Sequence, residues 1–188
     1  MSSGTYVTQM VTLERRGKRK EHFNYFHSLA YPYVGITSEV DITEFYHYVK
    51  SKEYPFCATS HTVAKEDGTY AYCTLDARKN LQDFLEYASG LQEQAKMDGN
   101  IEEDAAEALS LIFVSTVPWI TYTSIVQPVP MPADSNPRIT WGKYTVKEDK
   151  VSMPVSVLCH HALVDGKHIA DFYRLLEEKM RQLVADEL

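Results

Sequence analysis

Eight residues near the end of the sequence, CHHALVDG at 159–166, separate two different hydrophobic patterns. Before them, residues 151–159 alternate with a period of two, which predicts a strand with one buried face. After them, apolar residues recur every three or four positions from Ile169 to Leu183, which predicts an amphipathic helix. The stretch therefore joins a strand to a helix and places two adjacent histidines at the junction.

A loop at the end of a strand can hold an imidazole at the rim of a sheet, where a neutral histidine acts as a general base. His161 and Asp165 are the candidates for such chemistry. A structural interpretation stands beside this one, because Asp is favoured as a helix cap and one of two adjacent histidines is often simply buried. A lone H-x-x-x-D would favour the structural interpretation, whereas the whole string is much more specific.

Composition limits the class of protein. A chain of 188 residues, 44% hydrophobic and 24% charged, is expected to form one domain over 1–188. The net charge of −7 argues against a nucleic acid or an anionic membrane as partner. No run is long and apolar enough to cross a bilayer, and the first ten residues lack a signal-peptide core, so we expect a cytoplasmic protein.

The three cysteines lie far apart in the sequence and form no C-x-x-C pair, so neither a disulfide framework nor a zinc site is indicated. Cys159 directly precedes the two histidines. On the apolar face of a strand it is interpreted as a small buried residue without a catalytic role.

Periodicity and turn residues predict the remaining elements. Helices are expected at 20–29, 45–49 (after Asp41 as a cap) and 80–97. Strands are expected at 6–13, 36–40, 61–75 (with a turn), 109–114 and 138–146, and a proline-rich loop at 126–137. The run at 109–114 is nearly all apolar, which predicts a buried strand that delivers Ser115 to its end. Pro154 lacks an N–H, which predicts an edge position or a bulge.

The string H-H-x-x-x-D-G resembles the active-site motif of chloramphenicol acetyltransferases and, more distantly, that of the acyltransferase cores of 2-oxo acid dehydrogenase complexes. Further segments resemble the first family in the same order: R-K-E-H-F at 19–23, D-I-T at 41–43, the segment ending in P-W at 114–119, and T-W-G-K-Y at 140–144. The resemblance implies an α/β fold, an α+β two-layer sandwich whose mixed sheet has helices packed on one face.

The resemblance also implies an acetyl-CoA-dependent O-acetyltransferase that acts by direct transfer without an acyl-enzyme. It assigns His161 as the general base, Ser115 as a donor to the oxyanion, and Thr140 as a helper through a bound water. Asp165 would pair with Arg19 and so fix the loop that orients the imidazole. The neighbouring His160 is interpreted as structural.

Family positions around the coenzyme A channel match Tyr54, Trp119, Lys143 and Tyr144. Two of these residues also have a purely structural interpretation. Trp119 could be a core aromatic, and Lys143 could be an ordinary surface lysine. Family positions in the acceptor pocket match Phe26 and Ala30.

In that pocket region, Pro32 and Val34 differ from the family, so the acceptor is either chloramphenicol or another small hydroxylated molecule.

No metal and no bound cofactor are implied, since acetyl-CoA is a co-substrate. A homotrimer with active sites between subunits is expected.

The sequence departs from the family between about 57 and 61. In the family a long helix and a β-hairpin follow the tyrosine-proline that matches 54–55, and here residues 61–63 already resemble the strand after that hairpin. The domain is therefore expected to lack a helix and a hairpin, either because the natural protein is shortened or because the chain has been joined across an omitted segment.

The departure supports a competing hypothesis, a non-catalytic trimeric binding module of the same fold. Retention of His161, Asp165, Arg19, Ser115 and Thr140 together favours the enzyme. A dihydrolipoyl acyltransferase would ordinarily bring lipoyl and subunit-binding domains on Pro/Ala-rich linkers, which these 188 residues do not contain.

Overall fold

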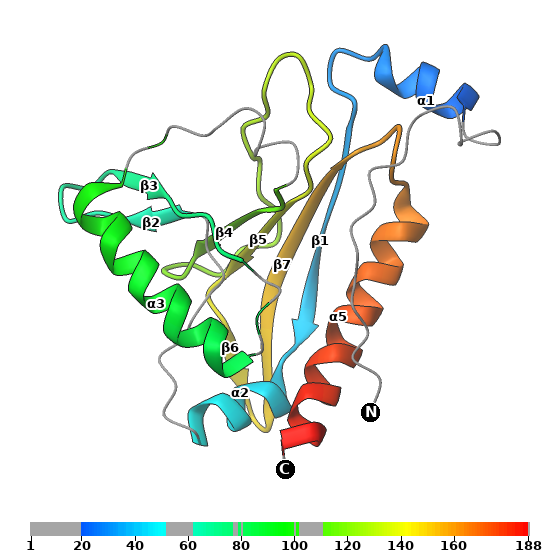
Figure 1. Ribbon diagram of the computed structural model, residues 1–188. Helices are drawn as coiled ribbons and strands as arrows, with labels where there is room; N and C mark the ends of the chain where they lie inside the picture. The colour runs from blue at the N-terminus through cyan, green and yellow to red at the C-terminus, as the bar shows by residue number, and fades with distance from the viewer. Residues whose placement is uncertain are drawn as a thin grey trace.

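The computed structural model describes residues 20–51, 62–76, 79, 81–99, 101 and 111–187. Within these residues the main sheet has five strands. They are β1 (Tyr33–Asp41), β7 (Lys150–His160), β5 (Arg138–Gly142) and β4 (Phe113–Val117) in spatial order, with β6 (Thr145–Lys147) also paired to β7. β7 is antiparallel to β1, β5 and β6, while β4 and β5 are parallel, so the sheet is mixed (Figure 1).

The strand predicted at 151–159 is confirmed, but the edge position expected from Pro154 is wrong. β7 pairs with β1 along one side and with β5 and then β6 along the other. Pro154 lies opposite Glu39, between Val155, where pairing with β5 ends, and Ser152, where pairing with β6 begins. Because the ladder on that side is already interrupted there, an interior strand tolerates a residue that has no N–H.

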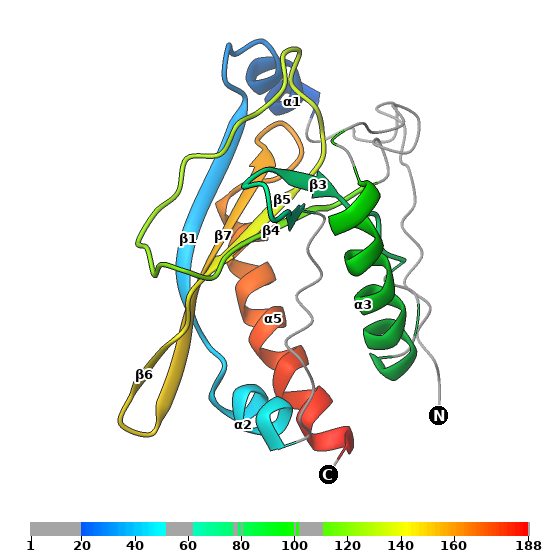
Figure 2. The ribbon, with the colours of Figure 1, turned by 90° about the vertical axis from the view of Figure 1, so that its left-hand side faces the viewer.

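Helices α5 (Gly166–Glu187) and α2 (Thr43–Ser51) cover one face of this sheet, and α3 (Leu81–Asp98) lies on the same side of it (Figure 2). The predicted terminal helix and its apolar stripe are confirmed, because Ile169 is 1% exposed and packs on Val157. The fold class expected from the sequence is therefore confirmed.

The other predicted helices are also present. α1 (Lys20–His27) lies near the junction of β7 and α5 (Figure 1). Asp41 Oδ1 accepts from the backbone N–H of Thr43 at 2.9 Å at the start of α2, as a capping side chain does. In the described parts of the chain no helix combines the length and apolarity that crossing a membrane requires.

A hairpin of β2 (Thr62–Ala64) and β3 (Tyr70–Tyr72) packs with α3 as a second small core, built around Val63, Cys73, Leu75, Phe84, Ala88 and Ala95. Gly68 has a φ of 83° in the hairpin turn. At the end of α3 a Cβ on Gly99 would lie 2.7 Å from Ala71 Cβ, so the helix approaches the hairpin closely only because this residue is glycine.

Two strand predictions are wrong in their bounds. Residues 109–114 were expected to form a buried strand that ends at Ser115, yet β4 is half-buried and Ser115 lies in its middle. β4 pairs with β5 from Phe113 to Val117, and this register, rather than apolarity alone, sets its length.

The single strand expected at 138–146 is divided into β5 and β6. The division follows Gly142, where a Cβ would lie 2.8 Å from the ring of Tyr122. Directly after it, the Lys143 N–H donates to the Ile120 carbonyl instead of continuing the ladder with β7. The predictions at 6–13 and at the 57–61 junction lie outside the described residues.

We predict that Ile169→Ala lowers the free energy of unfolding by about 2–5 kcal/mol, because it leaves a cavity under the sheet. Leu175→Ala on the same helix, where the leucine is 43% exposed, should cost about 1 kcal/mol or less. Urea denaturation followed by circular dichroism measures both. Equal losses would contradict the packing described for α5.

Candidate active site

The two faces of the sheet have different chemistry. On β5 and β7, Ile139, Val155 and Val157 belong to the core clusters under α5. Successive side chains of a strand point to opposite faces, so Thr140 and Ser156 point to the other face. The register aligns Ser115 with Thr140 and Thr140 with Ser156. Three hydroxyl side chains therefore lie in one row across the face away from α5.

A cavity of about 800 Å³ lies on this face. Its walls come from the β2–β3 hairpin, β4, β5 and the loop between β4 and β5, and both Ser115 and Thr140 line it. Trp119 also lines it and is 74% exposed, so it is not the core aromatic of the alternative interpretation. Ser115, Thr140 and Trp119, for which the sequence predicted different roles, thus line one cavity.

Loop side chains hold Thr140 in place. Its Oγ1 accepts from Gln127 Nε2, and its carbonyl accepts from the Tyr122 hydroxyl at 2.8 Å. Ser156 Oγ donates to the same phenol at 3.3 Å, and the Tyr122 ring covers Gly142. Sequence analysis missed Tyr122 and Gln127 because they lie in a loop without periodicity, where no local pattern indicates a contact with a strand.

Ser115 has a second hydroxyl beside it. Its Oγ lies 3.3 Å from Thr62 Oγ1, which β2 brings to the cavity wall. Either oxygen can be the donor, so Ser115 is able to turn its proton towards a ligand while Thr62 donates to it.

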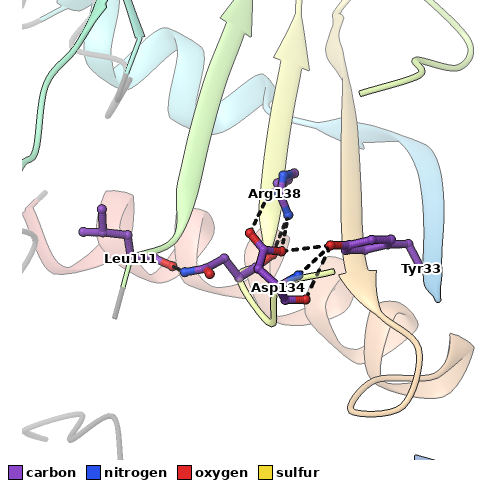
Figure 3. Close-up of polar contacts among 5 residues, drawn as sticks. Tyr33, Leu111, Asp134 and Arg138 are labelled. Carbon is purple, nitrogen blue, oxygen red and sulfur yellow. Dashed lines mark hydrogen bonds and ion pairs between the residues drawn. The ribbon is translucent and has the colours of Figure 1, made fainter. Parts of the chain in front are cut away.

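An ion pair forms one end of the cavity. Asp134, from the loop, accepts from Arg138 Nη1 at 2.8 Å and from Nη2 at 2.7 Å, and both residues line the cavity (Figure 3). The hydroxyl of Tyr33 donates to Asp134 Oδ1 at 3.0 Å. The guanidinium also lies over the Phe113 ring, 5.2 Å from its centre. This cluster could not be predicted from the sequence, since its members come from three separate segments.

Both members of the pair are charged. Burial alone would raise the pKa of Asp134, but the hydrogen bonds and charge of Arg138 outweigh it, so the pKa lies below the ordinary value of 3.8. Burial opposes the charge of Arg138 in the same way, and Asp134 raises the pKa of the guanidinium above its ordinary value. The side chains are only 13% and 20% exposed, so the pair is largely desolvated.

His161 follows directly after β7, at the end of the strand near α1. Its ring stacks on Phe26 with 3.8 Å between centres and 9° between planes, and its backbone N–H donates to the Pro32 carbonyl at 2.6 Å. Its Nδ1 is buried and has no hydrogen-bond partner among the residues that the structure describes. The imidazole is therefore oriented by stacking and by its backbone.

The residues before His161 are structural in character. His160 is 4% exposed and accepts at Nδ1 from the Ala162 N–H at 3.2 Å, while burial lowers the pKa of its imidazole. Burial raises the pKa of the Cys159 thiol to about 11, so the thiol stays protonated at neutral pH. Both observations agree with the structural interpretation of these two side chains.

The structure places the other predicted residues as follows. Asp165 Oδ1 lies 2.8 Å from His168 Nδ1 at the start of α5, and Arg19 and Tyr54 lie outside the described residues. Ala30 is exposed. Lys143 is exposed beside the segment that follows Trp119, whereas Tyr144 packs into the core, 5.1 Å from the ring of Tyr46.

Within one chain, His161 and the cavity hydroxyls are far apart. His161 lies five residues beyond Ser156, which corresponds to roughly 16 Å along an extended strand. Ser115 lies two strands away from β7, which adds roughly 10 Å across the sheet. One chain therefore does not bring His161 and Ser115 to the same small ligand.

Comparison with known proteins identifies the family. A family model for chloramphenicol acetyltransferase matches residues 57–177. The chain belongs to this family. Its curated relatives include the chloramphenicol acetyltransferase of Klebsiella sp, 28% identical over 195 aligned positions, which cover 85% of this chain and 87% of the relative. The chloramphenicol acetyltransferase of Clostridium butyricum is 30% identical over 118 positions, which cover 61% of this chain and 52% of the relative.

Solved structures agree in fold. A chloramphenicol acetyltransferase superimposes with a TM-score of 0.67 at 22% identity and covers 92% of this chain and 99% of its own. The cubic core of the pyruvate dehydrogenase multienzyme complex superimposes with a TM-score of 0.59 at 15% identity, covering 98% and 96%. Both expected resemblances are confirmed, and the chain is an acyltransferase of this family.

The depressed pKa of Asp134 predicts a pH dependence of stability. The carboxylate stabilises the folded state fully above the unfolded pKa near 3.8, and this contribution is lost as the pH falls through the lower folded pKa. The difference in unfolding free energy between the natural chain and Asp134→Asn should therefore be constant above about pH 5 and shrink below pH 4. Denaturant titrations at several pH values measure it, and a difference that does not change down to pH 3 would contradict the assignment.

Proposed function

We propose that this enzyme transfers the acetyl group of acetyl-CoA to a hydroxyl of chloramphenicol or of a similar small acceptor. The observation that carries the proposal is the alignment of Ser115 and Thr140 on the wall of one cavity, in a chain that belongs to this family. Attack on a thioester creates an oxyanion, which needs hydrogen-bond donors that are already in position. Ser115 donates to that oxyanion, and Thr140 assists through a bound water.

His161 acts as the general base and takes the proton of the acceptor hydroxyl as its oxygen attacks the thioester carbon. The bond between carbonyl carbon and sulfur then breaks, and the protonated His161 returns its proton to the leaving sulfur, so that coenzyme A leaves as the thiol and the imidazole is neutral again. Stacking on Phe26 fixes the plane of the imidazole, and the bond from the backbone N–H of His161 to the Pro32 carbonyl holds the backbone that carries it, so the base can meet its proton at hydrogen-bond distance.

The separation of His161 from the cavity supports a site shared between two copies. The Ser115–Thr140 wall of one subunit faces the His161 end of the next, and a closed ring of three subunits repeats this contact three times. Phe26 and Ala30 then contribute to the acceptor pocket from the same subunit as His161.

Coenzyme A approaches along the surface that carries Trp119 and Lys143. Trp119 is exposed at the cavity, where it can cover the pantetheine arm, and the exposed ammonium of Lys143 can meet a phosphate. Tyr54 belongs to the same channel in this proposal, whereas Tyr144, which the sequence also assigned to it, packs in the core beside Tyr46. Asp165 pairs with Arg19 and holds the loop behind His161, since a bidentate guanidinium suits a carboxylate.

Two alternatives to acetyl transfer to chloramphenicol are compatible with the same fold. A different hydroxylated acceptor keeps the mechanism, and the charged Arg138–Asp134 end of the cavity favours it. A non-catalytic trimeric module keeps the fold and loses the chemistry.

We predict that His161→Ala abolishes acceptor-dependent thiol release from acetyl-CoA. Ser115→Ala should lower kcat by about 10²–10³, the usual loss for one oxyanion donor. The assay follows the free thiol of coenzyme A with chloramphenicol and a panel of hydroxylated acceptors.

His47→Ala, an exposed histidine on α2, is the matched control and should retain full activity. Release with other acceptors but not with chloramphenicol keeps the mechanism and replaces the substrate. Release that survives His161→Ala would contradict the assigned base, and no release with any acceptor would favour the binding module.

A further inference from the structure

The hydroxyl groups on the face of the sheet away from α5 form a directed chain of hydrogen bonds. Ser156 Oγ donates to the Tyr122 hydroxyl at 3.3 Å, and that hydroxyl donates to the Thr140 carbonyl at 2.8 Å. A hydroxyl has one proton to donate, so in the contact of 2.7 Å between Thr37 Oγ1 and Ser156 Oγ the donor is Thr37. The protons of Thr37, Ser156 and Tyr122 are thus all used within the protein.

The hydroxyl of Thr140 differs from these three. Its Oγ1 accepts from Gln127 Nε2, and no atom among the described residues accepts its proton. Thr140 is only 2% exposed, and it lines the cavity that also holds Ser115. Gln127 therefore occupies one side of Oγ1 and leaves the proton of Thr140 available to a ligand in the cavity.

The other end of the Gln127 amide provides a second observation. Its Oε1 is buried and has no hydrogen-bond partner in the described part of the chain. A buried carbonyl oxygen without a partner destabilises a protein, and a methionine side chain would fill the same space without that loss. A residue that only fastened the loop would not need an amide. The bond from Nε2 to Thr140 is what the amide adds.

We propose that Gln127 is a positioning residue that makes Thr140 a hydrogen-bond donor in the acyl-transfer reaction. Its amide N–H holds Oγ1 from one side, so that the hydroxyl proton points into the cavity. A hydrogen bond accepted by Oγ1 also polarises its O–H group and strengthens the bond that this group donates. The inference rests on the proposed function, in which Thr140 assists the oxyanion through a bound water.

The direction of the bond between residues 127 and 140 decides whether Thr140 can assist. If the Thr140 proton were donated to the side chain at position 127, Oγ1 would present only lone pairs to the cavity, where the reaction needs a donor. A carboxylate at position 127 produces this case, because it can only accept. Methionine produces a third case, in which Oγ1 has no bond to position 127 and its proton is free to rotate.

The test compares three side chains of similar size at position 127 of the full-length protein. Gln127→Met should lower kcat for thiol release by about tenfold, the contribution of one hydrogen bond, and leave KM unchanged because the donor acts in the transition state. Gln127→Glu should lower kcat further, because its carboxylate takes the Thr140 proton. The opposite order, with the Glu variant more active than the Met variant, would mean that the natural amide accepts from Thr140 and would overturn the inference.

Stability distinguishes positioning from packing. Gln127→Met removes the buried Oε1, so the free energy of unfolding in urea should be unchanged or higher although activity falls. A residue that only fastened the loop would lose stability and activity together, and that result would also overturn the inference. Ser124→Ala, at an exposed position of the same loop, is the matched control and should retain both.

A double-mutant cycle tests whether Gln127 acts through Thr140. In the Thr140→Val background, which lacks the hydroxyl, Gln127→Met should change kcat by less than about twofold. The same loss in both backgrounds would show that Gln127 acts independently of Thr140, contrary to the inference.

NMR with isotope-labelled glutamine separates this inference from the proposed function. If no acceptor supports thiol release, the proposed function fails, and the side-chain amide signal of Gln127, assigned by its loss in Gln127→Met, decides the inference. A Gln127 N–H signal that moves upfield in Thr140→Val supports the bond to Oγ1, and a signal that does not move overturns it. If transfer occurs and all three side chains at position 127 give equal kcat, the inference fails and the acetyltransferase stands.

Discussion

The backbone ladder of β7 positions almost everything else in this chain. It pairs with β1 over nine register positions on one side and with β5 and β6 on the other, and its inward side chains form the core with α5. Because β7 pairs with β1 without a break from Ser152 to His160, the distance between Ser156, beside the cavity hydroxyls, and His161, directly after the strand, cannot be shortened without breaking hydrogen bonds. This separation supports the proposal that a second copy of the chain completes the site.

Elements with strong periodicity could be predicted from the sequence. The terminal helix, α3 and β7 all carry long apolar patterns, and the structure confirms them. The strand around Ser115 was less predictable, because an edge strand is half-buried and its length is set by pairing with β5 rather than by its own residues. Pro154 was misplaced for a related reason, since a gap between two partner strands is a property of the sheet that one strand does not reveal.

The site divides in the same way. Ser115, Thr140 and His161 could be singled out because they belong to contiguous strings of residues. Tyr122, Gln127 and the Tyr33–Asp134–Arg138 cluster could not, since they join separate segments through side chains. These long-range contacts shape the cavity. The family resemblance predicted the fold and the class of enzyme, which contiguous strings of residues carry, and it did not indicate these contacts.

The central claim is that the base and the oxyanion donors of one active site come from different copies of the chain. Its most direct test is to co-express His161→Ala and Ser115→Ala chains with different tags, purify the mixed assemblies, and measure thiol release from acetyl-CoA. In a ring of three that contains both kinds of chain, one of the three shared sites combines an intact His161 with an intact Ser115, so about a third of the natural activity should return. Mixed assemblies that are no more active than the two variants alone would contradict the claim and place both residues in one subunit's site.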